Sequence, residues 1–290
     1  MVKNILKGAV MGIANIIPGV SGGTMAVSMG IYDKIIHAVT HLFSEFKQSM
    51  KVLVPIGVGI VLAIVAVARL IEYMFGVIPF QTNMLFIGLI LGGLPAMGKK
   101  VKGHSVRISH IIAFLLFFAL VAGCASLEGS EGSAADLSFS LVNVVKLLGV
   151  GVIASATMVV PGVSGSMILM IIGYYEPVLG MVNQFVDHLK EFDVQGLISD
   201  CGVLVPFGIG VVAGIFVIAK IIEVIFANWP LVAYWAIIGL ILASPVAILM
   251  MNQFGSLKLL TIVTGIGALA VGIVASLLLG GEEESEADSF

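Results

Sequence analysis

The sequence predicts an all-α polytopic membrane protein made of two inverted-topology repeats. Three observations predict this fold class: an apolar composition, a series of long apolar runs, and a duplicated pattern of residues. Of the 290 residues, 59% are hydrophobic and 11% carry a charge, whereas a soluble domain has about 25% charged residues. The 35 glycines fit helices that pack closely, or that are interrupted, within a bilayer.

A motif that interrupts the apolar sequence occurs twice and indicates an internal duplication. Residues 18–24 read Pro-Gly-Val-Ser-Gly-Gly-Thr, and residues 161–166, which begin 143 positions later, read Pro-Gly-Val-Ser-Gly-Ser. Further matches, the last three at an offset of 151, pair residues 30–33 with 173–176, 56–59 with 207–210, 69–72 with 220–223, and 87–91 with 238–242. We therefore predict a first repeat at residues 1–140, a second at 141–281, and an acidic, disordered tail at 282–290.

Each repeat is predicted to contain a broken-helix hairpin and three membrane-spanning helices. A spanning helix needs about 20 apolar residues, so each hairpin either re-enters the membrane or comprises two tilted spans. Both alternatives give an even number of crossings, and the three further spans make the total odd. The second repeat is therefore expected to be upside down. The hairpins cover residues 3–43 and 141–186, and the spans cover residues 52–75, 80–97, 108–126, 202–226, 230–250 and 257–280.

The positions of the basic residues favour a cytoplasmic N-terminus, because short cytoplasmic loops are enriched in lysine and arginine. With this orientation, eight basic residues fall inside and three outside. We expect a multi-pass protein of the cytoplasmic membrane, and inverted repeats with interrupted helices are a recurring plan of secondary transporters. The eight are Lys3, Lys7, Lys47, Lys51, Lys99, Lys100, Lys102 and Arg107, and the three are Lys146, Lys190 and Lys258.

The two motifs carry residues that suit an anion-binding site. Proline and glycine end one helix, and the next helix then starts with unpaired amide hydrogens and a partial positive charge. Hydroxyl groups at such a start add further donors. The alternative is that both motifs are tight turns or helix-packing glycines with capped serines. The predicted substrate-binding residues are Ser21, Gly22, Gly23 and Thr24 in the first motif, and Ser164, Gly165 and Ser166 in the second.

Two pairs of oppositely charged residues occupy matching positions in the repeats. Arg69 and Glu72 correspond to Lys220 and Glu223, and the spacing of three places each pair on one helical face. Ionisable groups within a membrane span are costly and suggest function. Arg69 and Lys220 are therefore predicted to bind a negatively charged substrate, while Glu72 and Glu223 are candidates for proton coupling. The alternative is an ion pair near each interface that takes no part in transport.

The sequence gives no indication of a cofactor, a metal ion or a catalytic site. His37 and His41 lie four residues apart, but no third ligand is spaced with them. No Walker-type Gly-Lys-Ser/Thr sequence is present, so ATP hydrolysis is not expected. No histidine lies near either motif in the sequence to activate its serines. We therefore predict no enzyme activity, no cofactor, no metal and no nucleic-acid partner.

The motifs also carry a resemblance to a known family. Residues 15–24 (Asn-Ile-Ile-Pro-Gly-Val-Ser-Gly-Gly-Thr), residues 30–32 (Gly-Ile-Tyr) and residues 160–166 resemble the PopT polyprenyl-phosphate transporters, formerly a family of unknown function. The resemblance covers nearly the whole chain. It implies translocation of undecaprenyl phosphate, or a related polyprenyl phosphate, across the cytoplasmic membrane, which recycles the carrier lipid of cell-wall polysaccharides. A phosphate headgroup is an anion, so the predicted site agrees with this substrate, and its isoprenoid tail would stay in lipid.

Three functions are compatible with these observations. The first is a lipid-phosphate flippase driven by an ion gradient, with polyprenyl phosphate and the bilayer as partners and with a homo-oligomer permitted. The second is a transporter or channel for a small inorganic anion. The third is a membrane enzyme such as a lipid phosphatase, which would need an acid–base partner for its nucleophile. A lateral opening to lipid beside the motifs would distinguish the first function from the second.

Overall fold

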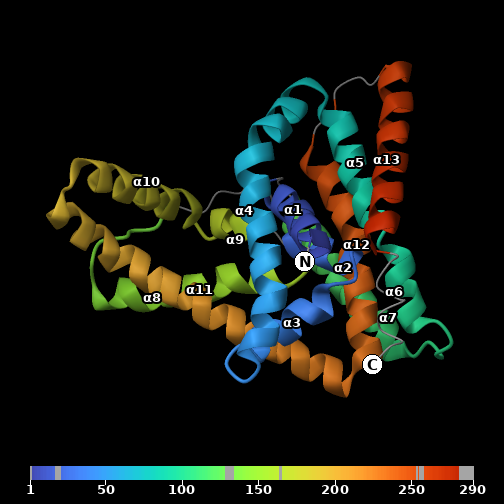
Figure 1. Ribbon diagram of the computed structural model, residues 1–290, viewed down its shortest axis with the longest axis horizontal. Helices are drawn as coiled ribbons and strands as arrows, with labels where there is room; N and C mark the ends of the chain where they lie inside the picture. The colour runs from blue at the N-terminus through green and yellow to red at the C-terminus, as the bar shows by residue number, and fades with distance from the viewer. Residues whose placement is uncertain are drawn as a thin grey trace.

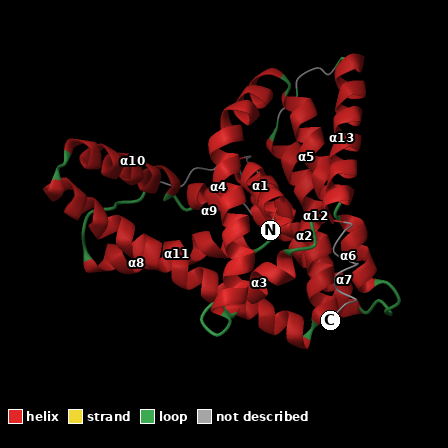
Figure 2. Cartoon of the chain, in the orientation of Figure 1, coloured by secondary structure: helices red, strands yellow, loops and turns green. Residues whose placement is uncertain are grey.

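A computed structural model describes residues 2–16, 21–127, 134–162, 165–252, 254 and 258–280, except for the side chains of residues 16, 67–69, 72, 167 and 280. The described residues form helices joined by loops and turns, with no β-strand among them (Figure 2). The predicted all-α class is therefore confirmed. The predicted tail at residues 282–290 lies outside the described residues.

Seven helical segments of the described chain are long and apolar enough to cross a membrane, as a polytopic membrane protein requires. They are α4 (Phe46–Val77), α5 (Pro79–Leu91) together with α6 (Leu94–Val101), α7 (Ile108–Ser126), α8 (Leu141–Val159), α11 (Val194–Asn228), α12 (Pro230–Met251) and α13 (Leu259–Gly280). The other helices are α1 (Val2–Ile16), α2 (Gly22–Ser28), α3 (Tyr32–Thr40), α9 (Gly165–Ile171) and α10 (Tyr175–Glu191).

The first two helices, α1 and α2, lie antiparallel and form a hairpin. At the tip, the backbone amide of Gly22 donates to Asn15 Oδ1 at 2.8 Å. At the open end, the Lys7 ammonium donates to the carbonyl of Met29, directly after α2, at 3.2 Å. The end of α2 therefore lies beside the first turns of α1, and the chain returns to the side from which it started.

Lys7 is buried in this hairpin, with 3% of its surface exposed. Counting Lys7 among the loop charges that set the topology is therefore wrong. Its apolar neighbours in the sequence place it within α1, and the carbonyl groups at the end of α2 attract its positive charge. The sequence could have indicated this burial, because Lys7 lies inside an apolar run and not in front of that run.

The long helices α4 and α11 pack through glycines at matching positions of the duplicated sequence. α1 lies along α4, and α8 lies along α11. A side chain at Gly59 would meet the carbonyl oxygen of Ile5, and a side chain at the equivalent Gly210 would meet the carbonyl oxygen of Leu148. Small residues let membrane helices approach backbone to backbone. The same contact therefore occurs in both halves of the chain.

The last helix of each half packs on the other half: α7 lies along α12, and α13 lies along α5 (Figure 1). α5 and α12 also touch each other, and two ring contacts indicate that they run in opposite directions. Phe80, at the start of α5, packs edge-on against Phe254, just after α12, with 5.1 Å between the ring centroids. His110, in the first turn of α7 and therefore in the segment that follows α6, stacks on Trp235 near the start of α12, with 6.3 Å between the ring centroids.

The main hydrophobic core lies where the first hairpin meets α5 and α12. Met25 and Met29 from the hairpin, Ile90 from α5, and Ile241 and Ile248 from α12 are almost completely buried and belong to one cluster. Every residue of α2 is buried. The short helix that follows the first motif is therefore held at the centre of the molecule rather than at its surface.

α8, α10 and α11 extend as an arm to one side of the molecule (Figure 1). His188, in the last turn of α10, attaches this helix to α11, because its Nδ1 donates to the buried carboxylate of Asp200 at 2.7 Å. This hydrogen bond raises the pKa of His188 above its ordinary value of 6.5. The attachment of α10 is therefore expected to depend on pH.

We expect α10 to open more readily as the pH rises. Because the folded-state pKa of His188 is raised, the interaction contributes in full below about pH 6.5 and is lost as the pH passes through the higher folded-state value. Hydrogen exchange of the α10 amides, corrected for intrinsic rates, will measure this opening. His188→Gln should remove the pH dependence, whereas substitution of the exposed His104 to Ala should keep it. A wild-type protein that opens equally at each pH would contradict the prediction.

Candidate functional site

The described part of the first motif, residues 21–24, forms a capped helix start. Ser21 is the N-cap of α2, and its hydroxyl accepts a hydrogen bond from the backbone amide of Thr24 at 3.2 Å. Asn15 accepts the amide of Gly22, as described above. These two amides, which the sequence predicts to bind an anion, therefore have protein acceptors in this conformation. An anion could use them only by exchanging with those acceptors.

The second motif meets the first at this helix start. The backbone amide of Gly162 donates to Thr24 Oγ1 at 2.7 Å and lies 3.2 Å from Ser21 Oγ. Gly162 has a φ of +83°, a conformation that glycine adopts without strain. Nearby, the Tyr32 hydroxyl donates to the carbonyl of Val159 at 3.1 Å. The structure thus brings the predicted residues Ser21 and Thr24 into buried contact with the second motif.

Only part of the second motif is described. Gly165 and Ser166 begin α9, and a Cβ atom at Gly165 would lie 3.0 Å from Thr157 Oγ1 at the end of α8. The predicted residue Ser164 lies outside the described residues. α9 packs against α8, so the order of long helix, motif and short helix seen in α1 and α2 occurs again.

We expect Thr24→Val to destabilise the protein by about 1 to 2 kcal/mol, because the buried Gly162 amide loses its shorter hydrogen bond. Valine has nearly the shape of threonine, so packing should change little. Thr24→Ser keeps the hydroxyl and is the matched control. Thermal unfolding in detergent will measure the difference. Equal loss of stability in the two variants would show that the methyl group, not the hydroxyl, is what matters at this position.

Among the described contacts, the predicted charged residues pair with each other and with the end of α3 rather than with the motifs. The Lys220 ammonium is 2.6 Å from Glu223, and this pair on α11 lies beside α3, where Glu223 approaches His41 Nδ1 at 3.5 Å. The side chains of Arg69 and Glu72, the equivalent pair on α4, are outside the described residues. The structure therefore joins Lys220 and Glu223 to each other and to α3.

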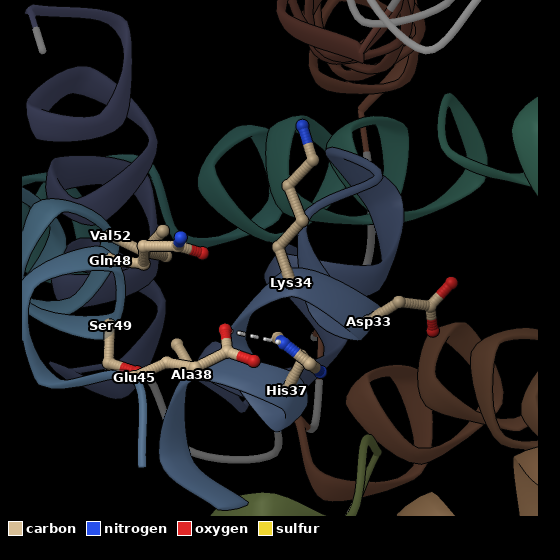
Figure 3. A pocket seen from close by; sticks show the side chains of 8 residues that line it. All are labelled: Asp33, Lys34, His37, Ala38, Glu45, Gln48, Ser49 and Val52. Atoms are coloured by element: carbon tan, nitrogen blue, oxygen red, sulfur yellow. Dashed lines mark hydrogen bonds and ion pairs between the residues drawn. The ribbon is translucent and has the colours of Figure 1, made fainter. Parts of the chain in front are cut away.

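A cavity of about 330 Å³ lies between α3 and the start of α4. In Figure 3, His37 and Glu45 point toward each other across it, with 3.3 Å between His37 Nε2 and the Glu45 carboxylate. Sequence analysis found no third ligand for His37 and His41, yet the structure places Glu223 beside them. Sequence spacing could not identify this third residue, because Glu223 is far from both histidines along the chain. The lining residues are Asp33, Lys34, His37, Ala38, Glu45, Gln48, Ser49 and Val52.

Comparisons with known proteins agree with the sequence analysis. A sequence model described as undecaprenyl phosphate translocase-like matches residues 11–261. A polyprenyl-phosphate transporter of Staphylococcus aureus is 30% identical over 84% of this chain and 85% of its own length. A polyprenyl-phosphate transporter of Vibrio cholerae is 32% identical over 62% of this chain and 60% of its own length. No solved structure matches the chain.

The names of both relatives are those of transporters and not of enzymes, which confirms the predicted class and disfavours a lipid phosphatase. The family predicted from the motifs is also confirmed, since the match covers most of the sequence, including both motifs. The chain therefore belongs to the undecaprenyl phosphate translocase-like family of membrane proteins.

Proposed function

We propose that this protein is a flippase that carries undecaprenyl phosphate, or a related polyprenyl phosphate, across the cytoplasmic membrane. Relatives at 30% and 32% identity are named polyprenyl-phosphate transporters. The observation that carries the proposal is the contact between the two motifs, in which the Gly162 amide lies 2.7 Å from the Thr24 hydroxyl. This contact joins the interrupted helices of both halves, at the place where a transported headgroup would cross from one half to the other.

The proposed mechanism is alternating access by two inverted repeats, each with a re-entrant hairpin and with the N-terminus in the cytoplasm. The opposite directions of α5 and α12, whose sequences match, support this arrangement. So do the matching glycine contacts at Gly59 and Gly210. Transporters of this plan move one repeat against the other around a fixed site near the middle of the membrane. A single chain supplies both hairpins, so one chain suffices for one pathway.

The headgroup would bind by replacing the hydrogen bonds between the motifs. Ser21 and Thr24 supply hydroxyl groups, and Gly162 supplies an amide, all within hydrogen-bonding reach of one another. When the hairpins separate, these donors lose their present partners, and unsatisfied donors are costly away from water. Phosphate oxygens are strong acceptors that can satisfy several donors at once. The lipid phosphate would therefore stabilise the separated arrangement, with Gly22, Gly23, Ser164, Gly165 and Ser166 completing the site.

The charged pairs would couple binding to an ion gradient. Arg69 and Lys220 are the proposed cationic ligands of the headgroup, and Glu72 and Glu223 are the proposed proton acceptors. In this conformation Glu223 holds the Lys220 ammonium at 2.6 Å, and the Lys220 side chain is 61% exposed. Protonation of Glu223 would end the ion pair and leave the ammonium to the phosphate. The isoprenoid tail would remain in the lipid outside the protein.

The test is lipid translocation in proteoliposomes. Fluorescent polyprenyl phosphate is placed in both leaflets, and a membrane-impermeant quencher reports the fraction that becomes accessible with time. The wild-type protein should accelerate exposure of the inner-leaflet lipid. The Ser21→Ala and Thr24→Val double variant should slow it by about 30-fold, the effect of losing two hydrogen bonds of about 1 kcal/mol each. Ser44→Ala, in an exposed turn, is the matched control.

Two outcomes would contradict the proposal. Passage of inorganic phosphate into the vesicles without acceleration of the lipid would favour the small-anion transporter. Release of inorganic phosphate from the labelled lipid would favour a phosphatase. Lipid exposure, entry of inorganic phosphate and release of phosphate from the lipid can all be measured on one preparation of vesicles. An inactive protein gives none of these signals, whereas a small-anion transporter or a phosphatase gives the signal of its own function.

A further inference from the structure

Three metal-ligating side chains meet where α3 of the first half touches α11 of the second. One ring nitrogen of His37, one of His41 and a carboxylate oxygen of Glu223 lie within 4.8 Å of one another. The two imidazole rings, one helical turn apart, stack with their centroids 4.2 Å apart. Glu223 reaches them from the other half of the chain, with its Oε1 3.5 Å from His41 Nδ1.

Two imidazoles and one carboxylate are a ligand set typical of zinc. Imidazole nitrogen suits zinc and neighbouring transition metals, whereas magnesium and calcium prefer oxygen ligands alone. Three protein ligands leave the fourth position of a tetrahedral ion for water. A zinc ion holds its ligand atoms roughly 3.3 Å apart, so the three atoms would have to close in from within 4.8 Å, and the two stacked rings would have to turn until their nitrogen lone pairs meet at one point. All three are partly exposed, with 58%, 30% and 26% of the side chains of His37, His41 and Glu223 accessible.

The groups around these side chains would orient them for a metal. The Glu45 carboxylate lies 3.3 Å from the ring of His37, and a carboxylate partner on a histidine ligand fixes the ring and increases its basicity. Glu223 Oε2 lies 2.6 Å from the Lys220 ammonium, so Oε1, 3.5 Å from His41 Nδ1, is the oxygen open to a metal ion. The cavity in Figure 3 is lined by His37 and Glu45, so an ion from solution can reach the imidazole of His37.

We propose that His37, His41 and Glu223 form a zinc-binding site that links α3 to α11. The bound ion holds the first half of the chain against the second and stabilises the conformation described here. The Lys220 ammonium competes with the ion, because its positive charge is paired with the same carboxylate. Zinc binding does not depend on what the protein transports, and it can be measured in the absence of any lipid substrate.

Zinc titration of the full-length, chelator-treated protein in detergent tests the proposal. Zinc chloride should raise the unfolding temperature in a saturable manner, and magnesium chloride should not. Cobalt should give the visible absorption bands of a tetrahedral site. His41→Ala and Glu223→Gln should each weaken zinc binding more than Glu45→Gln, which removes only an outer partner and should cost about 10- to 100-fold. Substitution of the exposed His104 to Ala should have no effect.

Lys220→Met should strengthen zinc binding, whereas the ligand substitutions weaken it. Removing the ammonium removes a repulsion between cations a few ångströms apart, so zinc should bind about tenfold more tightly than to the wild type. This variant keeps all three ligands, and it therefore tests the site even if a ligand variant fails to fold. Absence of tetrahedral cobalt bands in the wild type, equal zinc affinity in wild type and His41→Ala, or weaker binding in Lys220→Met would each overturn the proposal.

Discussion

A disulfide between Gly23→Cys and Pro161→Cys should stop lipid transport almost completely. A Cβ atom at Gly23 would lie 3.5 Å from Pro161 Cα, so the two Cα atoms are no more than about 5 Å apart, within the range of about 4.4 to 6.8 Å that a disulfide spans. The bond would hold the two motifs in contact. If the headgroup must replace the hydrogen bonds between Thr24 and Gly162, a protein that cannot separate its hairpins cannot bind it.

The reduced form of the same variant is the control, because it carries the same substitutions without the bond. The native Cys124 and Cys201 are first changed to Ser so that they form no other disulfide. Transport in proteoliposomes should fall in proportion to the cross-linked fraction, measured by mass spectrometry of the joined peptide, and a reductant should restore it. Full transport by the cross-linked protein would show that the motifs need not part, and alternating access through this contact would then be wrong.

The fold class and the family could be predicted from the sequence because both depend on local patterns. Apolar composition excluded a soluble domain, and the repeated motif identified the family. The break between α5 and α6 is a feature that such local patterns do not predict. The sequence predicts one span over residues 80–97, but the helix breaks at Gly92 and Gly93. A side chain at Gly93 would meet Ser28 on α2, a contact that no local pattern contains.

The contacts of the candidate site were harder to predict because they join distant parts of the chain. The Gly162 amide is a backbone group, so no side chain in the sequence marks it as the partner of Thr24. The approach of Glu223 to His41 depends on how α11 lies against α3. Sequence analysis placed Ser21, Thr24 and Glu223 among the candidate residues from chemistry and repetition, whereas their partners required the packing of complete helices.

Gly59→Ala should be the most damaging single substitution among the glycines of α4, and Gly57→Ala should be harmless. A Cβ atom at Gly59 would meet the carbonyl oxygen of Ile5, whereas a Cβ atom at Gly57 has nothing within 4 Å. Backbone cannot move aside as a flexible side chain can, so α1 must shift away from α4, at a cost of about 1 to 3 kcal/mol or more. The shift would also displace the hairpin that carries Ser21 and Thr24.

The duplication makes the same prediction for the second half. Gly210 and Gly208 are the equivalents of Gly59 and Gly57 at an offset of 151, and a Cβ atom would meet Leu148 at Gly210 but nothing within 4 Å at Gly208. Thermal unfolding of the four alanine variants should therefore give two destabilised and two wild-type-like proteins. If Gly59→Ala were destabilising and Gly210→Ala were neutral, the two hairpins would not be equivalent in packing. A mechanism in which each repeat rocks as a similar rigid unit would then lose its structural basis, even if transport itself were observed.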